Sequence, residues 1–189
     1  MEKNKYFLIG IPNSGKTTLG RRVAEHLQIP FFDTDDIAKS RMGDIVTDGF
    51  STVIWQAYDE QIKATLEFAS HSGSAIIATG AEIGLIPKCV RLMRNIGFII
   101  HVQRDVETIL AELSEIVGPR YVVESRGGDT VSTIDLNAKI VQLYSKEIPH
   151  YDAVADLFLD NNSGEDKGAE QLILLIQALE SMSAKKNSV

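Results

Sequence analysis

A glycine-rich turn that directly follows an apolar run constrains this chain more than any other feature. Residues 6–11, YFLIGI, have the composition of a buried strand, and GIPNSGKT at residues 10–17 matches the pattern G-x-x-x-x-G-K-[ST]. Apolar residues then recur at four-residue spacing from Leu19 to Leu27, which predicts a helix that begins near Lys16. A strand, a glycine-rich turn and a helix in this order form a loop whose backbone N–H groups bind phosphate.

Each part of this loop has a physical role in holding the phosphate chain of a nucleotide. Gly10 and Gly15 allow the tight turn, Lys16 reaches the outer phosphates, and Thr17 offers its hydroxyl to Mg²⁺. The other loop residues that we expect at the nucleotide are Asn13, Ser14 and Thr18. A glycine-rich turn without a ligand is the alternative, and the predicted strand before the loop and helix after it favour the nucleotide.

The rest of the chain alternates apolar runs with helix-like segments. Further strands are predicted at 29–32, 74–80, 97–102 and 156–160, and further helices at 33–41, 51–71, 85–95, 104–113, 134–148 and 166–182. This alternation predicts a central parallel sheet of about five strands with helices on both faces, the three-layer α/β sandwich of P-loop NTPases.

The length of the chain suits one domain, which we expect to span residues 1–182, followed by a polar tail at 183–189. Residues 114–133 contain two adjacent glycines and read as a loop that is long for a compact domain. Such a loop is either a functional lid or a poorly ordered insertion.

The formal net charge of −7 argues against a general nucleic-acid or anionic-membrane binder, which normally presents a basic face. Residues 1–11 are too short and polar for a signal peptide, and we find no apolar run long enough to span a membrane. We therefore expect a cytoplasmic protein, a monomer or weak dimer, whose partner is a small hydroxylated molecule.

Three carboxylates follow the second predicted strand, in the segment FFDTDD. In open α/β sheets, ligands bind at the carboxyl ends of the strands, where Asp33, Asp35 and Asp36 are expected. A carboxylate there can hold the water shell of Mg²⁺ or accept a proton from a hydroxyl group. The alternative is that Asp33 or Asp35 only caps the next helix.

Three ordered segments, GIPNSGKT, FFDTDD and IPHYDAVAD, together with IIATG, resemble the shikimate kinase family over roughly residues 5–180. The resemblance implies ATP-dependent phosphorylation of a ring hydroxyl, with Mg²⁺. It implies that Lys16 and Thr17 contact phosphate and metal, that Asp33 supports the metal, and that Asp35 orients or deprotonates the acceptor hydroxyl. Such transfer depends mainly on positioning and charge stabilisation.

The resemblance also implies a lid that brings an arginine to the γ-phosphate. Arg120, in GPRYV, is the nearest match, and Arg126 is the substitute; a solvated loop arginine is the alternative for both. The segment LDNN resembles the stretch that lies beside adenine, which places Asn162 there.

The acceptor site departs from the family pattern. Its expected residues, on helices within 34–71 and around two other segments, are Asp35, Gln56, Gly80, Ala81, Glu82 and Glu147. Gln56 and Glu147 stand where the family has arginines for the shikimate carboxylate, and Glu82 stands where the family has a glycine. Losing a bidentate arginine to a buried carboxylate costs about 2–5 kcal/mol. These changes disfavour shikimate and allow a neutral polyol, a sugar or an amine-bearing acceptor.

Three alternatives stay open at this point. The acceptor can be gluconate or another sugar, or the chain can bind nucleotide as a regulatory protein without catalysis. A shifted alignment would leave Glu82 and Glu147 in solvent and let Lys146, Arg91 or Arg126 bind a carboxylate.

Overall fold

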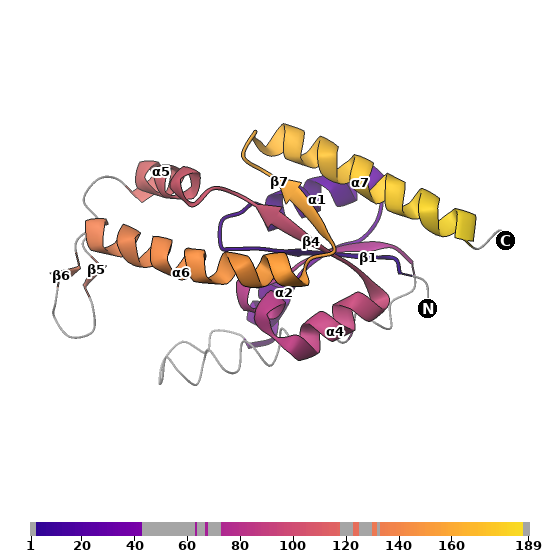
Figure 1. The fold of residues 1–189 in the computed structure, drawn as a ribbon, viewed down its shortest axis with the longest axis horizontal. Helices are drawn as coiled ribbons and strands as arrows, with labels where there is room; N and C mark the ends of the chain where they lie inside the picture. Colours follow the sequence, from indigo (N-terminus) through magenta and orange to yellow (C-terminus); the bar gives the residue numbers. More distant parts are fainter. Residues whose placement is uncertain are drawn as a thin grey trace.

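A computed structural model describes residues 3–42, 63, 67, 73–117, 123–124, 130–131 and 133–186. Five parallel strands form one sheet in the order β2-β3-β1-β4-β7 (Figure 1). The strands are β1 (Lys5–Ile9), β2 (Phe31–Asp33), β3 (Ala75–Ala78), β4 (Gly97–Gln103) and β7 (Leu157–Asp160). The helices are α1 (Lys16–Leu27), α2 (Thr34–Met42), the short 3-10 helix η2 (Ala81–Leu85), α4 (Pro87–Ile96), α5 (Val106–Val117), α6 (Thr133–Val154) and α7 (Glu165–Lys186).

The central strand β1 separates two apolar layers. Because side chains of a strand alternate between its faces, Phe7 and Ile9 pack in one cluster and Tyr6 and Leu8 in the other. All five residues of β1 are buried, as expected for a strand covered on both faces. This buried strand leads straight into the phosphate loop.

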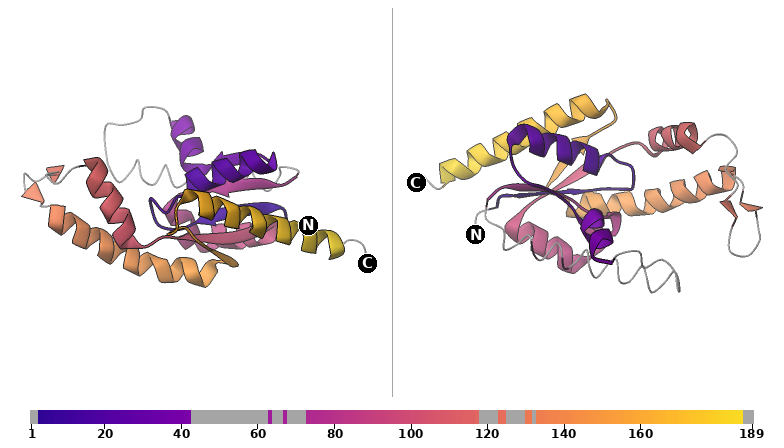
Figure 2. Two further views of the ribbon diagram at one scale, coloured as in Figure 1. Left: turned by 90° about the horizontal axis from the view of Figure 1, so that it is seen from above. Right: turned by 180° about the vertical axis from the view of Figure 1, so that it is seen from behind.

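Helices cover both faces of the sheet (Figures 1 and 2). Buried residues of α1 and α7 pack with Leu8 in one layer, whereas buried residues of α4 and α6 pack with Phe7 in the other. The predicted three-layer α/β sandwich with a five-stranded parallel sheet is therefore confirmed. No helix in the described ranges is long and apolar enough to cross a membrane.

Parallel pairing brings the carboxyl ends of the strands to one edge of the sheet. The register pairs Leu8 and Asp33 with Ala78 from opposite sides, so the phosphate loop, the start of α2 and the Thr79–Gly80 turn follow three neighbouring strands. This edge positions the functional groups described below.

The predicted end of the helix at residue 148 is wrong, since α6 continues through Pro149 to Val154. A proline inside a helix removes one backbone hydrogen bond, which disfavours a helix that continues past it. Tyr151 lies beyond the proline and is fully buried against the sheet. Tertiary packing thus stabilises the last turn of α6 in spite of the proline.

Three other segments differ from the sequence prediction. The loop predicted at 114–133 contains the end of α5 and a short antiparallel pair, β5 (Val123–Glu124) and β6 (Thr130–Val131). The tail predicted at 183–189 is helical as far as Lys186, where basic residues favour the negative end of the helix dipole. The short helix η2 was not predicted, because its residues show no helical periodicity.

Candidate active site

The phosphate loop requires its two glycines for steric reasons. Gly10 and Gly15 have φ angles of 143° and 97°, in the region that L side chains rarely adopt. A Cβ atom at Gly10 would lie 2.7 Å from the carbonyl oxygen of Val102, so the loop can approach the backbone of β4 only with glycine there. A Cβ atom at Gly15 would meet the side-chain amide of Asn161, and the positive φ of Gly15 itself favours glycine.

Lys16 begins α1 and is buried beneath the loop. Its Nζ donates hydrogen bonds to the carbonyl oxygens of Gly10 and Ile11, both at 2.9 Å. Burial lowers the pKa of Lys16 to about 8, although nearby carboxylates, Asp35 first among them, oppose the shift. The loop thus fixes the position of the Lys16 ammonium group through two backbone hydrogen bonds.

Asp33 joins the phosphate loop to helix α2. Thr17 Oγ1 donates a hydrogen bond of 2.7 Å to Oδ2 of Asp33, while Oδ1 accepts bonds from the backbone N–H groups of Asp35 at 2.9 Å and Asp36 at 3.4 Å. One carboxylate therefore caps α2 and also faces Thr17. The two roles that the sequence presented as alternatives for Asp33 are compatible.

Asp35 lies in the first turn of α2, half-buried. Burial raises the pKa of its carboxyl group, and the charge of Asp33 raises it further, whereas Lys16 and Lys39 lower it. A carboxylate whose pKa is raised accepts a proton more readily, so Asp35 has the chemistry of a general base.

The predicted acceptor residues around β3 and α6 meet at the same edge. The backbone N–H of Gly80 donates to Thr34 Oγ1 at 2.8 Å, which ties the β3 turn to α2. The Tyr151 hydroxyl donates to the carbonyl oxygen of Ala81 at 2.8 Å and lies 3.3 Å from Oε2 of Glu147. Helix α6 is thereby fastened to η2 beside the phosphate loop.

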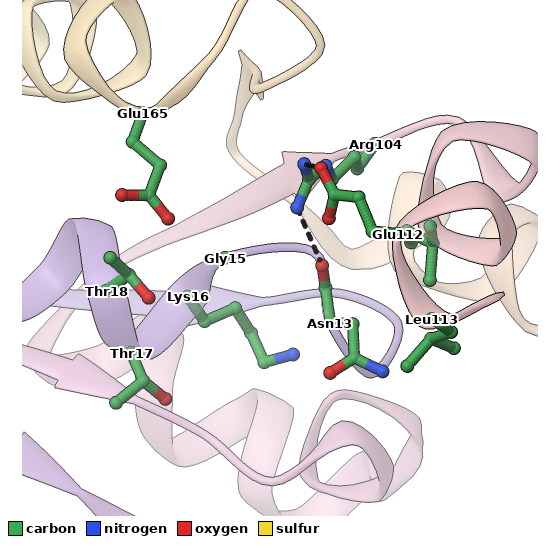
Figure 3. Close-up of a pocket in the computed structure, with 10 residues that line it drawn as sticks. Asn13, Gly15, Lys16, Thr17, Thr18, Arg104, Glu112, Leu113 and Glu165 are labelled. Carbon is green, nitrogen blue, oxygen red and sulfur yellow. Dashed lines mark hydrogen bonds and ion pairs between the residues drawn. The ribbon is translucent and has the colours of Figure 1, made fainter. Parts of the chain in front are cut away.

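A cavity of about 270 Å³ opens next to the phosphate loop (Figure 3). It is lined by Asn13, Gly15, Lys16, Thr17, Thr18, Arg104, Ile109, Glu112, Leu113 and Glu165. Figure 3 shows the Arg104 guanidinium between the backbone of Asn13 and the carboxylate of Glu112, with Glu165 near Thr18. Residues of α1, α5 and α7 thus line the cavity together with the phosphate loop.

Sequence reasoning missed two residues that hold the loop. Arg104 donates to the carbonyl oxygen of Asn13 at 3.3 Å and pairs with Glu112. Asn161 is buried, and its Nδ2 donates to the carbonyl oxygen of Ser14 at 2.9 Å. Each directly follows a sheet strand, β4 or β7, so the rule that placed Asp33 at a carboxyl end would have found both.

Asn162 links the segment after β7 to the segment after β4. Its Oδ1 accepts a bond from the backbone N–H of Asp105 at 2.8 Å, and its Nδ2 donates to Oδ1 of Asp160 at 2.8 Å. It lines a second cavity, of about 400 Å³, which Arg104 also lines. Gln56, Arg120 and Arg126, which the sequence assigned to the acceptor and the lid, lie outside the described residues.

Known proteins share both the sequence pattern and the fold. The family model described as shikimate kinase matches residues 12–177. A shikimate kinase of Clostridium beijerinckii is 28% identical over 160 residues, which cover 85% of this chain and 87% of that protein. The solved shikimate kinase from Acinetobacter baumannii in complex with shikimate has a TM-score of 0.71 at 21% identity, covering 93% of this chain and 94% of that one. A gluconokinase from Sinorhizobium meliloti has a TM-score of 0.57 at 12% identity, covering 96% and 97%.

These structural likenesses show the fold, a P-loop NTPase-type sandwich, and the family match spans most of the chain. Lysine, threonine and carboxylate groups lie at the edge of the sheet where such a fold binds its ligands. The chain therefore belongs to the shikimate kinase family and is a small-molecule kinase, a phosphotransferase with an alcohol acceptor.

Proposed function

We propose that this kinase transfers the γ-phosphoryl group of ATP to a hydroxyl of a small metabolite, with Mg²⁺, at the edge formed by the phosphate loop and α2. One observation carries the assignment of this site. The Thr17 hydroxyl donates a hydrogen bond to Asp33 at 2.7 Å, in the residue after the buried Lys16. Asp35 follows Asp33 by two residues, in the first turn of α2.

The residues at this edge fit both ATP and Mg²⁺. The nucleotide contacts are proposed at the loop residues Gly10, Asn13, Ser14, Gly15, Lys16, Thr17 and Thr18, with Asn162 near the base. Thr17 and Asp33 offer the oxygen ligands that Mg²⁺ prefers. When bound, ATP supplies the phosphoryl group and Mg²⁺ neutralises the charge that develops during transfer.

The chain's own residues position the acceptor and move its proton. Asp35 accepts the hydroxyl proton, a role supported by its half-buried place at the start of α2 and its raised pKa. Lys16 stabilises negative charge at the transferred group. Arg120, from the lid proposed at 114–133, adds a second positive charge there.

The acceptor lies, in this proposal, against Gln56, the turn from Gly80 to Glu82, and Glu147. Burial and the charge of Glu82 raise the pKa of Glu147, which supports a position of Glu147 in the site rather than in bulk solvent. Shikimate is disfavoured by these residues. It remains the alternative acceptor because curated relatives are shikimate kinases, and a gluconate-type sugar is the second. Cytoplasmic location and a monomer or weak dimer remain predictions.

The test compares two neighbouring aspartates in a coupled assay of ADP release over shikimate, quinate, gluconate, sugars, polyols and aminocyclitols. Asp35→Asn should lower kcat by about 10²–10⁴-fold on any accepted substrate, because it removes the proton acceptor, while the Kd for ATP changes less than about twofold. Asp36→Asn is the matched control. The Asp36 side chain is exposed and forms a surface ion pair with Arg21 at 3.7 Å, so the same change of charge there should leave turnover intact. Full turnover by Asp35→Asn would refute the assignment of Asp35.

A further inference from the structure

Two glutamates beside the phosphate lysine have no role in nucleotide binding or proton transfer. The charges of Asp35, Asp33, Glu82 and Glu147 all act on the Lys16 ammonium. Asp33 and Asp35 are accounted for by the metal and the hydroxyl proton. Glu82 comes from η2 and Glu147 from α6, so two separate elements bring negative charge toward Lys16.

Glu147 is held there by the fold. Tyr151, one helical turn later, is fully buried, donates its hydroxyl to Ala81 and lies 3.3 Å from the Glu147 carboxylate. Ala81 immediately precedes Glu82, an exposed residue, so the contact that fastens α6 to η2 also holds Glu147 close to the segment that carries Glu82. Burial raises the pKa of Glu147, and the charge of Glu82 raises it further, whereas the hydrogen bond from Tyr151 lowers it.

The charges around this space favour a cation. Among the described residues, Lys16 lies close enough for its positive charge to lower the pKa of Glu147. In the proposed function, Lys16 is engaged by phosphate, so its charge no longer balances the glutamates. Two unit charges 4 Å apart interact with about 1 kcal/mol in water and about 4 kcal/mol near a protein surface. A carboxylate acceptor is repelled on that scale, and an ammonium group is attracted.

We propose that the acceptor is a hydroxylated amine, such as an amino sugar or aminocyclitol, whose ammonium group lies between Glu82 and Glu147. This inference rests on the proposed kinase function and names its substrate class. The hydroxyl oxygen forms the new bond to the γ-phosphorus, the bond to the β-phosphate oxygen breaks, ADP leaves, and the proton passes to Asp35. The ammonium group keeps its protons and serves only for recognition.

The experiment measures ADP release with two matched sets of acceptors. One set is glucosamine, N-acetylglucosamine, glucose and gluconate; the other is 2-deoxystreptamine, myo-inositol and shikimate. In at least one set, the amine should have a kcat/KM at least tenfold above its neutral and carboxylate counterparts. Equal or better turnover of the neutral or carboxylate compounds overturns the inference, as does the absence of turnover with both amines.

Charge-removing variants make the test specific. Glu82→Gln and Glu147→Gln should each lower kcat/KM for the amine at least tenfold without changing the KM for ATP. The ratio of kcat/KM for the amine to kcat/KM for the neutral counterpart should fall as well. Glu170 is an exposed residue of α7, and Glu170→Gln removes the same charge. This control variant should leave both kcat/KM for the amine and the KM for ATP unchanged. Thermal melting of each variant controls for folding. Unchanged discrimination in both glutamate variants overturns the inference.

The two proposals fail in different ways. Phosphorylation of a neutral or carboxylate acceptor in preference to the amines leaves the kinase function intact and refutes the substrate class alone. If no acceptor releases ADP and Mg²⁺-ATP does not raise the melting temperature, the proposed function fails and the inference fails with it.

Discussion

Lys16 shows how a single residue trades stability for function. Burial of an ammonium group is unfavourable, and within the described residues two backbone carbonyl groups accept its hydrogen bonds. The charge is retained in the fold because four carboxylates act on it. A bound phosphate chain would add direct hydrogen-bond acceptors for this ammonium group, so we interpret the cost of burying Lys16 as preparation for nucleotide binding.

The pH dependence of stability should reveal this residue. The pKa of Lys16 is about 8 in the folded chain against an ordinary 10.5, so the unfolded chain binds more protons between these values. The free energy of unfolding therefore rises with pH in this window, and the penalty is fully present below pH 8. Relative to Lys16→Met, the wild-type protein should gain about 2 kcal/mol between pH 7 and pH 10. Urea unfolding without nucleotide measures both proteins at each pH.

The same variant, Lys16→Met, also tests the role of Lys16 in catalysis. The variant should lose phosphoryl transfer by at least about 10²-fold, since a preorganised positive charge is removed from the transferred group. A constant difference in unfolding free energy across this pH range would contradict the burial of a charged Lys16, whatever the activity.

At the scale of elements, α7 shows how burial divides one helix. Leu172 is fully buried in the layer that α7 shares with α1, whereas Leu174, two residues later, is 66% exposed. Successive helical positions two apart point to different sides of a helix, which explains this contrast. The pair therefore separates the contribution of packing from that of helix propensity, because both residues lie in the same helix.

Leu172→Ala should lower the free energy of unfolding by about 2–5 kcal/mol, since it leaves a cavity in a packed layer. Leu174→Ala should change it by less than about 0.5 kcal/mol, as for an exposed position. Urea unfolding at constant pH compares the two. Similar losses in both variants would show that α7 does not pack on the sheet as described.

Local sequence patterns predicted the elements well where a single signal dominated. The alternation of apolar runs and helical segments predicted the parallel sheet, and the loop pattern at residues 10–17 predicted the strand before it and the helix that begins at Lys16. Long-range packing explains the misses: Tyr151 carries α6 past Pro149, and Asn161 reaches the loop from the far end of the chain. The hydrogen bonds of these two residues reach Ala81 and Ser14, which lie 70 and 147 positions away, and no local pattern records such a distance.

At the scale of the whole molecule, one sheet edge gathers groups from distant segments. Asn161 bonds to Ser14, Gly80 to Thr34, and Tyr151 to Ala81, so the phosphate loop, the β3 turn and α6 are linked through side chains. Two apolar layers on the faces of the same sheet support all of them. We therefore expect a ligand bound at this edge to stabilise the sheet itself, a coupling between binding and folding.

This coupling, together with the expectation of one domain over residues 1–182, predicts a single cooperative unfolding transition. Urea unfolding followed by far-ultraviolet circular dichroism and by tryptophan fluorescence should give coincident midpoints. Mg²⁺-ATP at 100 times its Kd should shift the entire transition by about 2.7 kcal/mol, because only the folded chain binds it. The same nucleotide should shift Lys16→Met far less. Two separate transitions, of which ATP moves only one, would contradict a single domain and confine nucleotide binding to one part of the chain.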